Sequence, residues 1–248
     1  MSRDERALEA GLSDPGIPRA LSSGDLEILG QLPNASNHTF LARTSLDREE
    51  GLAVYKPRRG EQPLWDFPEG TLCAREVAAY VVARTLGWPS VPATVLRDGP
   101  FGVGSVQAFV PADLEEHYFT LAERYPAEFR RIAAFDLVVN NGDRKAGHCL
   151  LGEDGAIHVV DHGVCFGEEP KLRTVIWDFV GQPTERATRA DLDRLASEVR
   201  GGALRSELAN LLDERELDAL ASRAAAVADL DRLPEPALDR RPFPWPPI

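Results

Sequence analysis

The segment 140–167, NNGDRKAGHCLLGEDGAIHVVDHGVCFG, constrains the fold more than any other part of the chain. Two short apolar runs, HCLLG and AIHVVD, surround the Asp-Gly pair of EDGA, which is a strong turn signal. We therefore expect a hairpin whose two ends lie together. This hairpin brings the polar loop with Asp143 and His148 next to Asp161, and Gly163 lets the backbone turn sharply just past it.

Two carboxylates and an imidazole then converge at one edge of the hairpin. Such a cluster is unfavourable unless a positive group joins it, and a divalent metal bound to phosphate oxygens is the usual partner. The alternative is that Asp143 caps a turn and Asp161 ends a strand, as aspartate often does. A structural turn does not by itself require a second acid at the far end of its hairpin, so the combination favours a metal-phosphate site. His158 and His162 are expected to be structural.

The composition narrows the kinds of partner. With 248 residues the chain can form one large domain or two lobes that share a cleft. A net charge of -12 repels phosphate backbones and anionic membranes, which argues against nucleic-acid binding. No stretch approaches the roughly eighteen apolar residues of a membrane span, and the polar N-terminus has no secretory signal. We expect no integral membrane association and a cytoplasmic location.

The cysteines and lysines give two further clues. Three cysteines without CxxC spacing argue against a disulfide framework and a zinc site. The 28 basic residues include only three lysines, Lys56, Lys145 and Lys171, so arginine is the usual solvated cation of this chain. Lysine gives a compact point charge where arginine gives a planar fork, which matters in a crowded phosphate site. Lys56 and Lys145 are therefore candidates for function.

The N-terminal half predicts a five-stranded antiparallel sheet with one helix. DLEILGQLPNASNHTFLARTS predicts two strands around residues 33–37, and GLAVYKP predicts a third that ends at Pro57. Apolar residues at helical spacing predict an amphipathic helix over 71–86, closed by Gly87. VPATVLR and GVGSVQAFV follow as two further strands.

Beyond Pro111 the pattern becomes helical. PAEFRRIAAFDLVVNN predicts one helix, and residues 187–230 are rich in helical periodicity. The tail RLPEPALDRRPFPWPPI is too rich in proline for helix or sheet, and we expect it to lie extended against the surface. The expected organisation is an N-terminal arm (1–23), an N-lobe (24–110), a C-lobe (111–232) and a proline-rich tail (233–248).

The order of these elements resembles the protein-kinase-like fold: a sheet with a lysine strand, a helix with a glutamate, a hinge, a helical lobe, an Asp-bearing loop and an Asp-x-Gly hairpin. NNGDRKAGH and VVDHGVCF are most similar to the phosphatidylinositol 3- and 4-kinase-like branch, which includes small bacterial members of unknown substrate. YKP, REVAAYVVARTLGW and GSVQAFV match that branch in the same order. The resemblance implies an α+β, two-lobed fold.

The resemblance also implies ATP as the cofactor. Lys56 would hold the α- and β-phosphates, and Glu76 would be the helix partner that fixes its rotamer, unless Glu76 is an ordinary solvated acid. Ser36 and Asn37 would replace the glycine-rich loop over the phosphates, although a simple hairpin turn explains PNASNHT equally well. At the hinge, adenine would contact backbone groups of Gln107 and Phe109, unless GSVQAFV is only a buried edge strand.

The loop and the hairpin carry the remaining roles that the resemblance implies. Asp143 would orient or deprotonate the acceptor hydroxyl, Arg144 would anchor the loop, and Lys145 would neutralise the transferring γ-phosphoryl group. Asp161 would bind Mg²⁺ that bridges the phosphates. His148 stands where the branch usually has asparagine as a second metal ligand, and imidazole prefers softer metals, which favours Mn²⁺.

Three functions fit this sequence. The first is a phosphotransferase that moves the γ-phosphoryl group of ATP to a hydroxyl of a protein or small molecule. The second is nucleotidyl transfer (AMPylation) on the same fold, and the third is a non-catalytic, nucleotide-binding regulatory module. A phosphoinositide acceptor fits poorly, because the chain is acidic and has no evident basic amphipathic helix. No pattern in the sequence indicates the oligomeric state.

Overall fold

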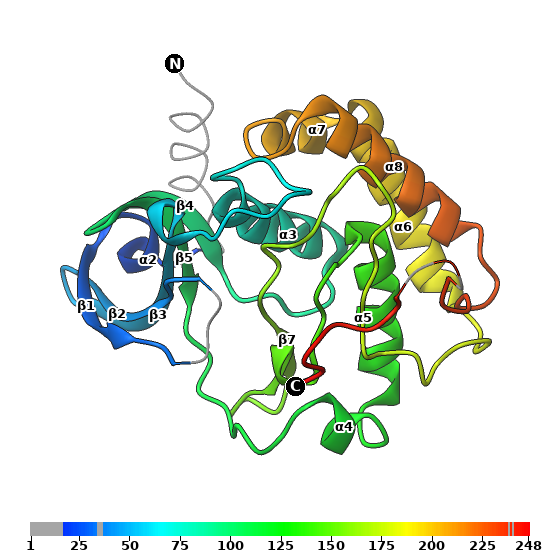
Figure 1. The fold of residues 1–248 in the computed structure, drawn as a ribbon, viewed down its shortest axis with the longest axis horizontal. Helices are drawn as coiled ribbons and strands as arrows, with labels where there is room; N and C mark the ends of the chain where they lie inside the picture. The colour runs from blue at the N-terminus through cyan, green and yellow to red at the C-terminus, as the bar shows by residue number, and fades with distance from the viewer. Residues whose placement is uncertain (1–16, 34–36, 238, 240) are drawn as a thin grey trace.

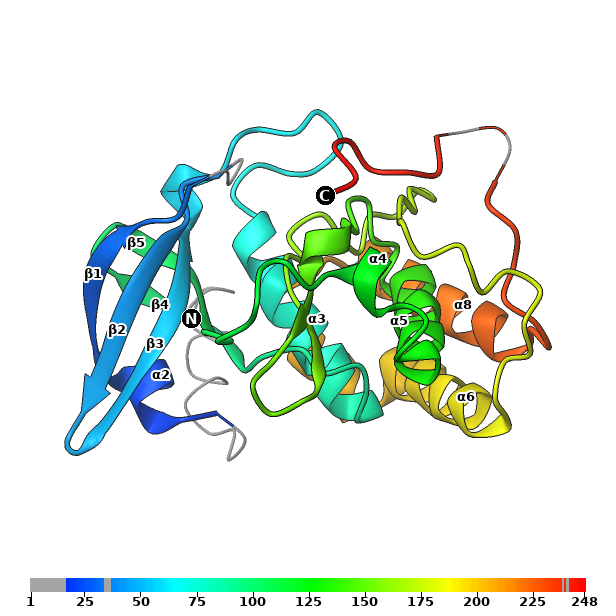
Figure 2. The same ribbon diagram turned by 90° about the horizontal axis from the view of Figure 1, so that it is seen from below.

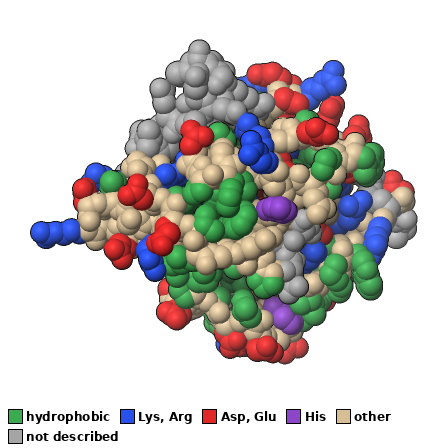
Figure 3. Space-filling model, turned by 60° about the vertical axis from the view of Figure 1, so that its left-hand side comes forward, with side chains coloured by type: hydrophobic (Ala, Val, Ile, Leu, Met, Phe, Trp, Pro, Cys, Tyr) green, Lys and Arg blue, Asp and Glu red, His purple; other side chains and the backbone are tan. Residues whose placement is uncertain are grey.

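A computed structural model of the chain describes residues 17–33, 37–237, 239 and 241–248. An antiparallel sheet from the N-terminal part lies beside a mostly helical C-terminal part (Figures 1 and 2). The predicted α+β class with two lobes is confirmed. Figure 3 shows acidic side chains spread over one face of the molecule, in keeping with the net charge of -12.

All five strands of the predicted sheet are present. The strands are β1 (Asp25–Gln31), β2 (Phe40–Leu46), β3 (Glu49–Pro57), β4 (Thr94–Gly99) and β5 (Gly102–Ala108). They follow the order β1-β2-β3-β5-β4, and every neighbouring pair is antiparallel. Successive side chains of a strand point to opposite faces, so the fully buried Ala53 and Tyr55 share one face and Val54 and Lys56 share the other.

A short helix, α2 (Arg19–Ser23), corrects the prediction that residues 1–23 form a loosely attached arm. Ala20 and Leu21 are buried, and α2 packs against strands β2 to β5. The Arg97 guanidinium of β4 donates to the carbonyls of Leu21 (3.1 Å) and Gly24 (2.7 Å). The helix is too short for its apolar residues to show a period, which is why the sequence pattern missed it. Residues 1–16 lie outside the described part of the chain.

Helix α3 (Leu72–Leu86) lies where the sequence predicts it, and Gly87 ends it in the left-handed region at φ 78°. The helix is not amphipathic, however, because it is buried on nearly all sides. It packs against β4 and β5 on one side and against helix α6 of the C-terminal lobe on another (Figure 2). Arg75, although buried, forms an ion pair with Glu216 and donates to the Cys165 carbonyl at 2.7 Å. Through these contacts α3 joins the two lobes.

The C-terminal lobe contains the predicted helices and hairpin. The helices are α4 (Tyr118–Leu121), α5 (Pro126–Val139), α6 (Arg186–Gly201), α7 (Ala203–Leu208) and α8 (Glu214–Ala228). The hairpin consists of β6 (Cys149–Leu151) and β7 (Ile157–Val159), and Gly155 in its turn has φ 77°. Two 3₁₀ turns, η1 (Arg58–Gly60) and η2 (Ala146–His148), flank the site described below.

The proline-rich tail lies extended on the C-terminal lobe, as predicted. Its described residues form neither helix nor strand beyond residue 232. The carbonyl of Pro242 accepts from the amide of Thr174 at 3.0 Å, and that of Pro247 accepts from the amide of Ala146 at 2.8 Å. The chain therefore ends beside β7 and the loop that precedes β6 (Figure 1).

Two further observations concern the cysteines and the helices. Cys73, Cys149 and Cys165 are buried free thiols. Among the residues that the structure describes, no helix combines the length and the apolar character needed to span a bilayer.

Candidate functional site

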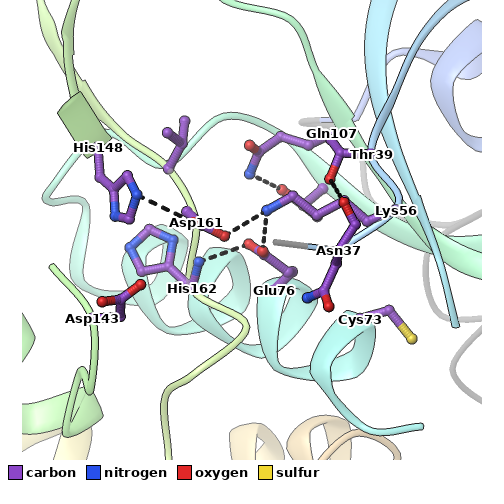
Figure 4. A network of polar contacts seen from close by, with 12 residues as sticks. Asn37, Thr39, Lys56, Cys73, Glu76, Gln107, Asp143, His148, Asp161 and His162 are labelled. Carbon is purple, nitrogen blue, oxygen red and sulfur yellow. Dashed lines mark hydrogen bonds and ion pairs between the residues drawn. The ribbon is translucent and has the colours of Figure 1, made fainter. Parts of the chain in front are cut away.

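Three charged side chains from separate elements meet between the sheet and the hairpin. Lys56 on β3 forms an ion pair with Glu76 on α3, and its Nζ lies 2.8 Å from Oδ1 of Asp161, which follows β7 (Figure 4). Glu76 is buried, whereas the Asp161 side chain is 48% exposed. Lys56 is therefore an amine fixed by one carboxylate and shared with a second carboxylate that is exposed to solvent. We call the region lined by Lys56, Glu76 and Asp161 the cleft.

The backbone at Asp161 differs from the expectation. Asp161 has φ 62°, a left-handed conformation that aspartate tolerates better than most residues, while no positive φ is found at Gly163. A Cβ at Gly163 would lie 3.4 Å from Leu72 Cβ and 3.6 Å from the Glu76 carboxylate, which is ordinary van der Waals contact. The sharp turn is therefore made at the acidic residue itself, and neither the backbone nor the space around position 163 requires glycine.

The charges of the cleft stabilise one another. Burial by itself lowers the pKa of Lys56, but the nearby carboxylates of Asp161 and Glu76 outweigh this effect and hold the pKa above its ordinary value. The Lys56 ammonium holds the pKa of Asp161 well below the ordinary carboxyl range, against the opposing effect of burial. Both groups are therefore ionised at neutral pH.

A buried ion pair anchors the loop that follows α5. Arg144 Nε and Nη2 donate to the Asp136 carboxylate at 3.0 and 2.9 Å, and neither side chain is exposed. Asn141 adds a second support, since its Oδ1 accepts from the amide of Asp143 at 2.9 Å and its Nδ2 donates to Asp136 at 3.1 Å. The position of Asp143 is therefore set by side chains below the loop, and Arg144 is part of that support rather than of the open cleft.

Asp143 lies beside the cleft with Lys145 as its cationic neighbour. Lys145 Nζ is 3.5 Å from Asp143 Oδ2. Burial raises the pKa of Asp143 to about 6, although Lys145 opposes the rise. Asp143 is therefore a carboxylate whose pKa lies close to the range that suits a general base at neutral pH.

His148 contacts the second carboxylate of the cleft. Its Nε2 lies 3.2 Å from Asp161 Oδ2, and its Nδ1 accepts from the amide of Lys145 at 3.3 Å. Burial lowers the pKa of His148 to about 4, so the imidazole is neutral at pH 7 and its proton sits on Nε2. Ligation of a metal by Nε2 would require His148 to give up its contact with Asp161 and change tautomer.

The side chains of the cleft fit a metal ion only if phosphate oxygens supply the remaining ligands. Among the described residues, no group of three or more His, Cys, Asp or Glu side chains is arranged to hold a metal ion. Mg²⁺ is commonly held by one or two carboxylates together with substrate phosphates. Asp161 provides such a carboxylate, with 48% of its side chain exposed.

The residues expected over the phosphates are only partly described. Ser36 lies outside the described residues. Asn37 lies on the Lys56 side of the cleft (Figure 4), and its Oδ1 accepts from the amide of Gln62 at 2.8 Å. This bond ties the β1–β2 connection to the segment between β3 and α3.

Gln107 and Phe109, which are expected to contact adenine at the hinge, lie at the end of β5 and just past it. Gln107 lies inside β5, paired with Val54 on one side and Thr94 on the other, and its side chain donates to Thr94 Oγ1 at 2.8 Å. The amide of Phe109 donates to the carbonyl of Leu52 at 3.0 Å. The sheet therefore engages the Phe109 amide and the Gln107 side chain, and the adenine contacts at the hinge stay a prediction.

Sequence reasoning missed two features of the cleft. Leu41 and Val54 are register partners, are partly exposed, and belong to the face of the sheet that carries Lys56. The alternation around Lys56 was a signal that could have identified them. His162, expected to be structural, contacts both Arg144 and Glu76 (2.7 and 2.9 Å). No sequence pattern indicates this double contact.

Comparisons with known proteins place the chain among relatives. No family model matches it. Protein Rv2133c of Mycobacterium tuberculosis is 39% identical over 261 residues, which cover 91% of this chain and 93% of that protein. Phosphatidylinositol 4-kinase gamma 4 of Oryza sativa subsp. japonica is 32% identical over 141 residues, which cover 47% of this chain and 24% of the plant protein.

Among solved structures, the Helicobacter pylori proinflammatory kinase CtkA aligns with 82% of this chain and 97% of its own, at 13% identity and a TM-score of 0.49. The kinase-like character of the fold follows from the order of its own elements. A lysine strand, a glutamate helix and an Asp-bearing hairpin converge on one cleft.

Proposed function

We propose that this chain, which belongs to the family of the Mycobacterium tuberculosis protein Rv2133c, transfers the γ-phosphoryl group of ATP to a hydroxyl of a protein or small molecule. One observation carries the proposal: Lys56 Nζ lies between the carboxylates of Glu76 and Asp161, 20 and 105 residues away along the chain. An amine and a metal-binding carboxylate that face one cleft are the groups that position a nucleoside triphosphate for phosphoryl transfer. The match to the plant phosphatidylinositol 4-kinase supports the same reaction class.

In this proposal each charged residue of the cleft has a separate task. Lys56 binds the α- and β-phosphates while Glu76 keeps its rotamer fixed. Asp143 accepts the proton of the acceptor hydroxyl, for which a pKa of about 6 is well matched. Lys145, beside Asp143, stabilises the charge of the transferring phosphoryl group.

The metal in this proposal is Mg²⁺ or Mn²⁺, held by Asp161 together with phosphate oxygens. When bound, it would neutralise phosphate charge during transfer. His148 stays within reach of the same carboxylate at 3.2 Å, and its imidazole would favour Mn²⁺ if it joined the metal.

The nucleotide base would lie against the apolar face of the sheet. Leu41 and Val54 belong to the face that carries Lys56, and both remain partly exposed. Because flat aromatic bases bind well to apolar surfaces with a few polar groups at the edge, this face suits adenine. The polar edge would come from the chain beyond β5, where residues 109–117 connect β5 to α4. We place the phosphate-covering role with Asn37 and Ser36.

A second candidate function rests on His148. The proton on its Nε2 points to Asp161, so His148 offers no free ligand atom for a second metal, whereas an asparagine would offer its side-chain oxygen. A changed metal arrangement is compatible with attack on the α-phosphate and transfer of a nucleotidyl group. This alternative differs from the first only in which phosphate is attacked.

Transfer of label distinguishes these functions. The purified protein is incubated with ATP labelled at the γ-phosphate or at the α-phosphate, with Mg²⁺ or Mn²⁺, and label is followed in protein and in small molecules. We expect transfer from the γ-position, abolished by Asp161→Ala. The control Asp193→Ala changes an exposed aspartate on α6 and is expected to keep full transfer. Label from the α-position identifies nucleotidyl transfer, and ATP binding without any transfer identifies a regulatory module.

A further inference from the structure

The residue after Asp161 is a buried histidine with an unusual set of contacts. His162 is fully buried, and its ring packs edge-on against Phe135 with centroids 5.8 Å apart. Its backbone amide donates to Glu76 Oε2 at 2.9 Å, and its Nε2 lies 2.7 Å from Arg144 Nη2 (Figure 4 shows the first contact). One residue therefore contacts both the helix that orients Lys56 and the loop that carries Asp143.

Arg144 holds the chain on both sides of Asp161. Its Nη1 donates to the carbonyl of Val160 at 2.9 Å, and its Nη2 donates to the imidazole of His162. The same guanidinium is fixed from below by Asp136. Asp161 itself has φ 62°, a conformation that persists only where surrounding contacts determine it. We call Arg144, Val160 and His162 the Asp161 clamp.

The protonation of His162 follows from these contacts. Arginine is always a donor, so the Nε2 of His162 must accept, and the proton must sit on Nδ1. That Nδ1 is buried and has no hydrogen-bond partner among the described residues. A buried N–H without a partner is unfavourable, and a phenylalanine ring would avoid the cost while still packing on Phe135. The polar ring is therefore better explained by its contact with Arg144 than by packing.

We propose that His162 is a positioning residue, which completes the Asp161 clamp and so holds the Asp161 carboxylate where a metal bound to phosphates can be ligated. This inference rests on the proposed function. It assigns His162 no contact with nucleotide or metal, since its side chain points to Arg144 and Phe135. The metal-dependent part of nucleotide binding should then depend on His162, whereas the contact between Lys56 and the phosphates should not.

Two variants separate the polar contact from packing. His162→Phe keeps the ring and the backbone amide that binds Glu76, but it removes the acceptor for Arg144. His162→Gln supplies a carbonyl oxygen that can accept from the same guanidinium. As a matched control, His158→Phe makes the same change in β7, where the imidazole contacts Ser90 and Asp154 and takes no part in the clamp.

Calorimetry measures ATP affinity with and without Mn²⁺ for each variant. The gain from Mn²⁺, which is the ratio of ATP affinity with Mn²⁺ to ATP affinity without metal, should be at least tenfold smaller in His162→Phe than in the native protein. The metal-free affinity of the variant should stay within twofold of the native value. His162→Gln should recover most of this gain, and His158→Phe should match the native protein. An unchanged gain in His162→Phe, or an equal loss with and without metal, would overturn the proposal and leave only a packing role.

Hydrogen exchange tests the clamp without any nucleotide. The amide of Val160 donates to the His148 carbonyl, and that of residue 162 donates to Glu76. We expect both to exchange at least tenfold faster in His162→Phe and at the native rate in His162→Gln. Unchanged exchange in His162→Phe refutes the clamp. If the native protein binds no ATP with any metal, the proposed function fails while the exchange result still decides whether the clamp exists.

Discussion

Replacing Asp136 by asparagine tests whether the loop that carries Asp143 is held by a buried charge pair. Asp136 and Arg144 have no exposed side-chain surface, and the carboxylate also accepts from Asn141 Nδ2 and Thr174 Oγ1 at 3.1 and 3.3 Å. Asparagine has nearly the same shape but no charge, and one of its two terminal groups is a donor. The Arg144 guanidinium would remain buried without a counter-ion, and the hydrogen bonds around position 136 would lose an acceptor.

The size of the effect follows from this geometry. Removing one partner of a fully buried ion pair costs about 3 to 5 kcal/mol, because the remaining charge stays desolvated. For a chain of 248 residues, each kcal/mol lowers the melting temperature by roughly 2 to 4 °C. We therefore expect Asp136→Asn to melt about 6 to 20 °C below the native protein. The free energy of unfolding in urea should fall by the same 3 to 5 kcal/mol, roughly.

The matched control is an exposed pair. Glu27 and Arg43 are 3.0 Å apart, with side chains 65% and 49% exposed. Exposed pairs contribute about 0 to 1 kcal/mol, so Glu27→Gln should unfold almost as the native protein does. If Asp136→Asn also loses less than about 1 kcal/mol, Arg144 is hydrated or re-paired in solution, and the view of a loop fixed from below is wrong.

Three further experiments probe the cleft and its surroundings. Because burial raises the pKa of Asp143 to about 6, kcat/KM should rise with pH through about 6 and fall away below it; an acid limb centred near pH 4 contradicts the assignment of Asp143 as base. His148→Asn should shift ATP-dependent thermal stabilisation from Mn²⁺ towards Mg²⁺, whereas an unchanged metal ranking removes His148 from the metal site. Ala146→Pro removes the amide that binds the Pro247 carbonyl, and the extended Lys145 before it tolerates proline. The amide of Thr174, which donates to the Pro242 carbonyl of the tail, should then exchange faster, and unchanged exchange shows that the Pro247 bond does not hold the tail.

The parts of the fold that the sequence predicted are those with short-range signals. The run GLAVYKP, ended by Pro57, placed Lys56 on β3, Gly87 ended α3, and the Asp-Gly turn closed the β6–β7 hairpin. Predicting that Lys56, Glu76 and Asp161 converge required the resemblance to a known fold, because Glu76 and Asp161 lie 20 and 105 residues from Lys56 along the chain. A local pattern contains no information about such contacts.

The features that escaped prediction depend on what surrounds a residue. The spacing in α3 is that of an amphipathic helix, yet packing between two lobes buries almost all of it, including Arg75. At the hinge, the extent of β5 decides which amides remain open, and the amide of Phe109 is bonded to the Leu52 carbonyl. The role of His162 arises only because Arg144 reaches it beneath Asp161. These outcomes are set by tertiary contacts that no short stretch of sequence specifies.

The charge balance of the cleft explains why a metal should matter so much to binding. Asp161 is shared by Lys56 and His148, and the latter is neutral at pH 7. Counting Asp161, Glu76 and Asp143 against Lys56 and Lys145, the cleft holds three carboxylates and two cations, and this surplus negative charge disfavours a free triphosphate. In the proposed function a divalent ion held by Asp161 would reverse this balance, and Lys56, paired with Glu76, would then be available to the phosphates. Nucleotide without metal should therefore bind weakly, and Asp161→Asn, which removes the surplus negative charge, should strengthen metal-free binding of ATP while abolishing the gain from metal. A loss of both in calorimetry would show that Asp161 contributes to the cleft through structure rather than through charge.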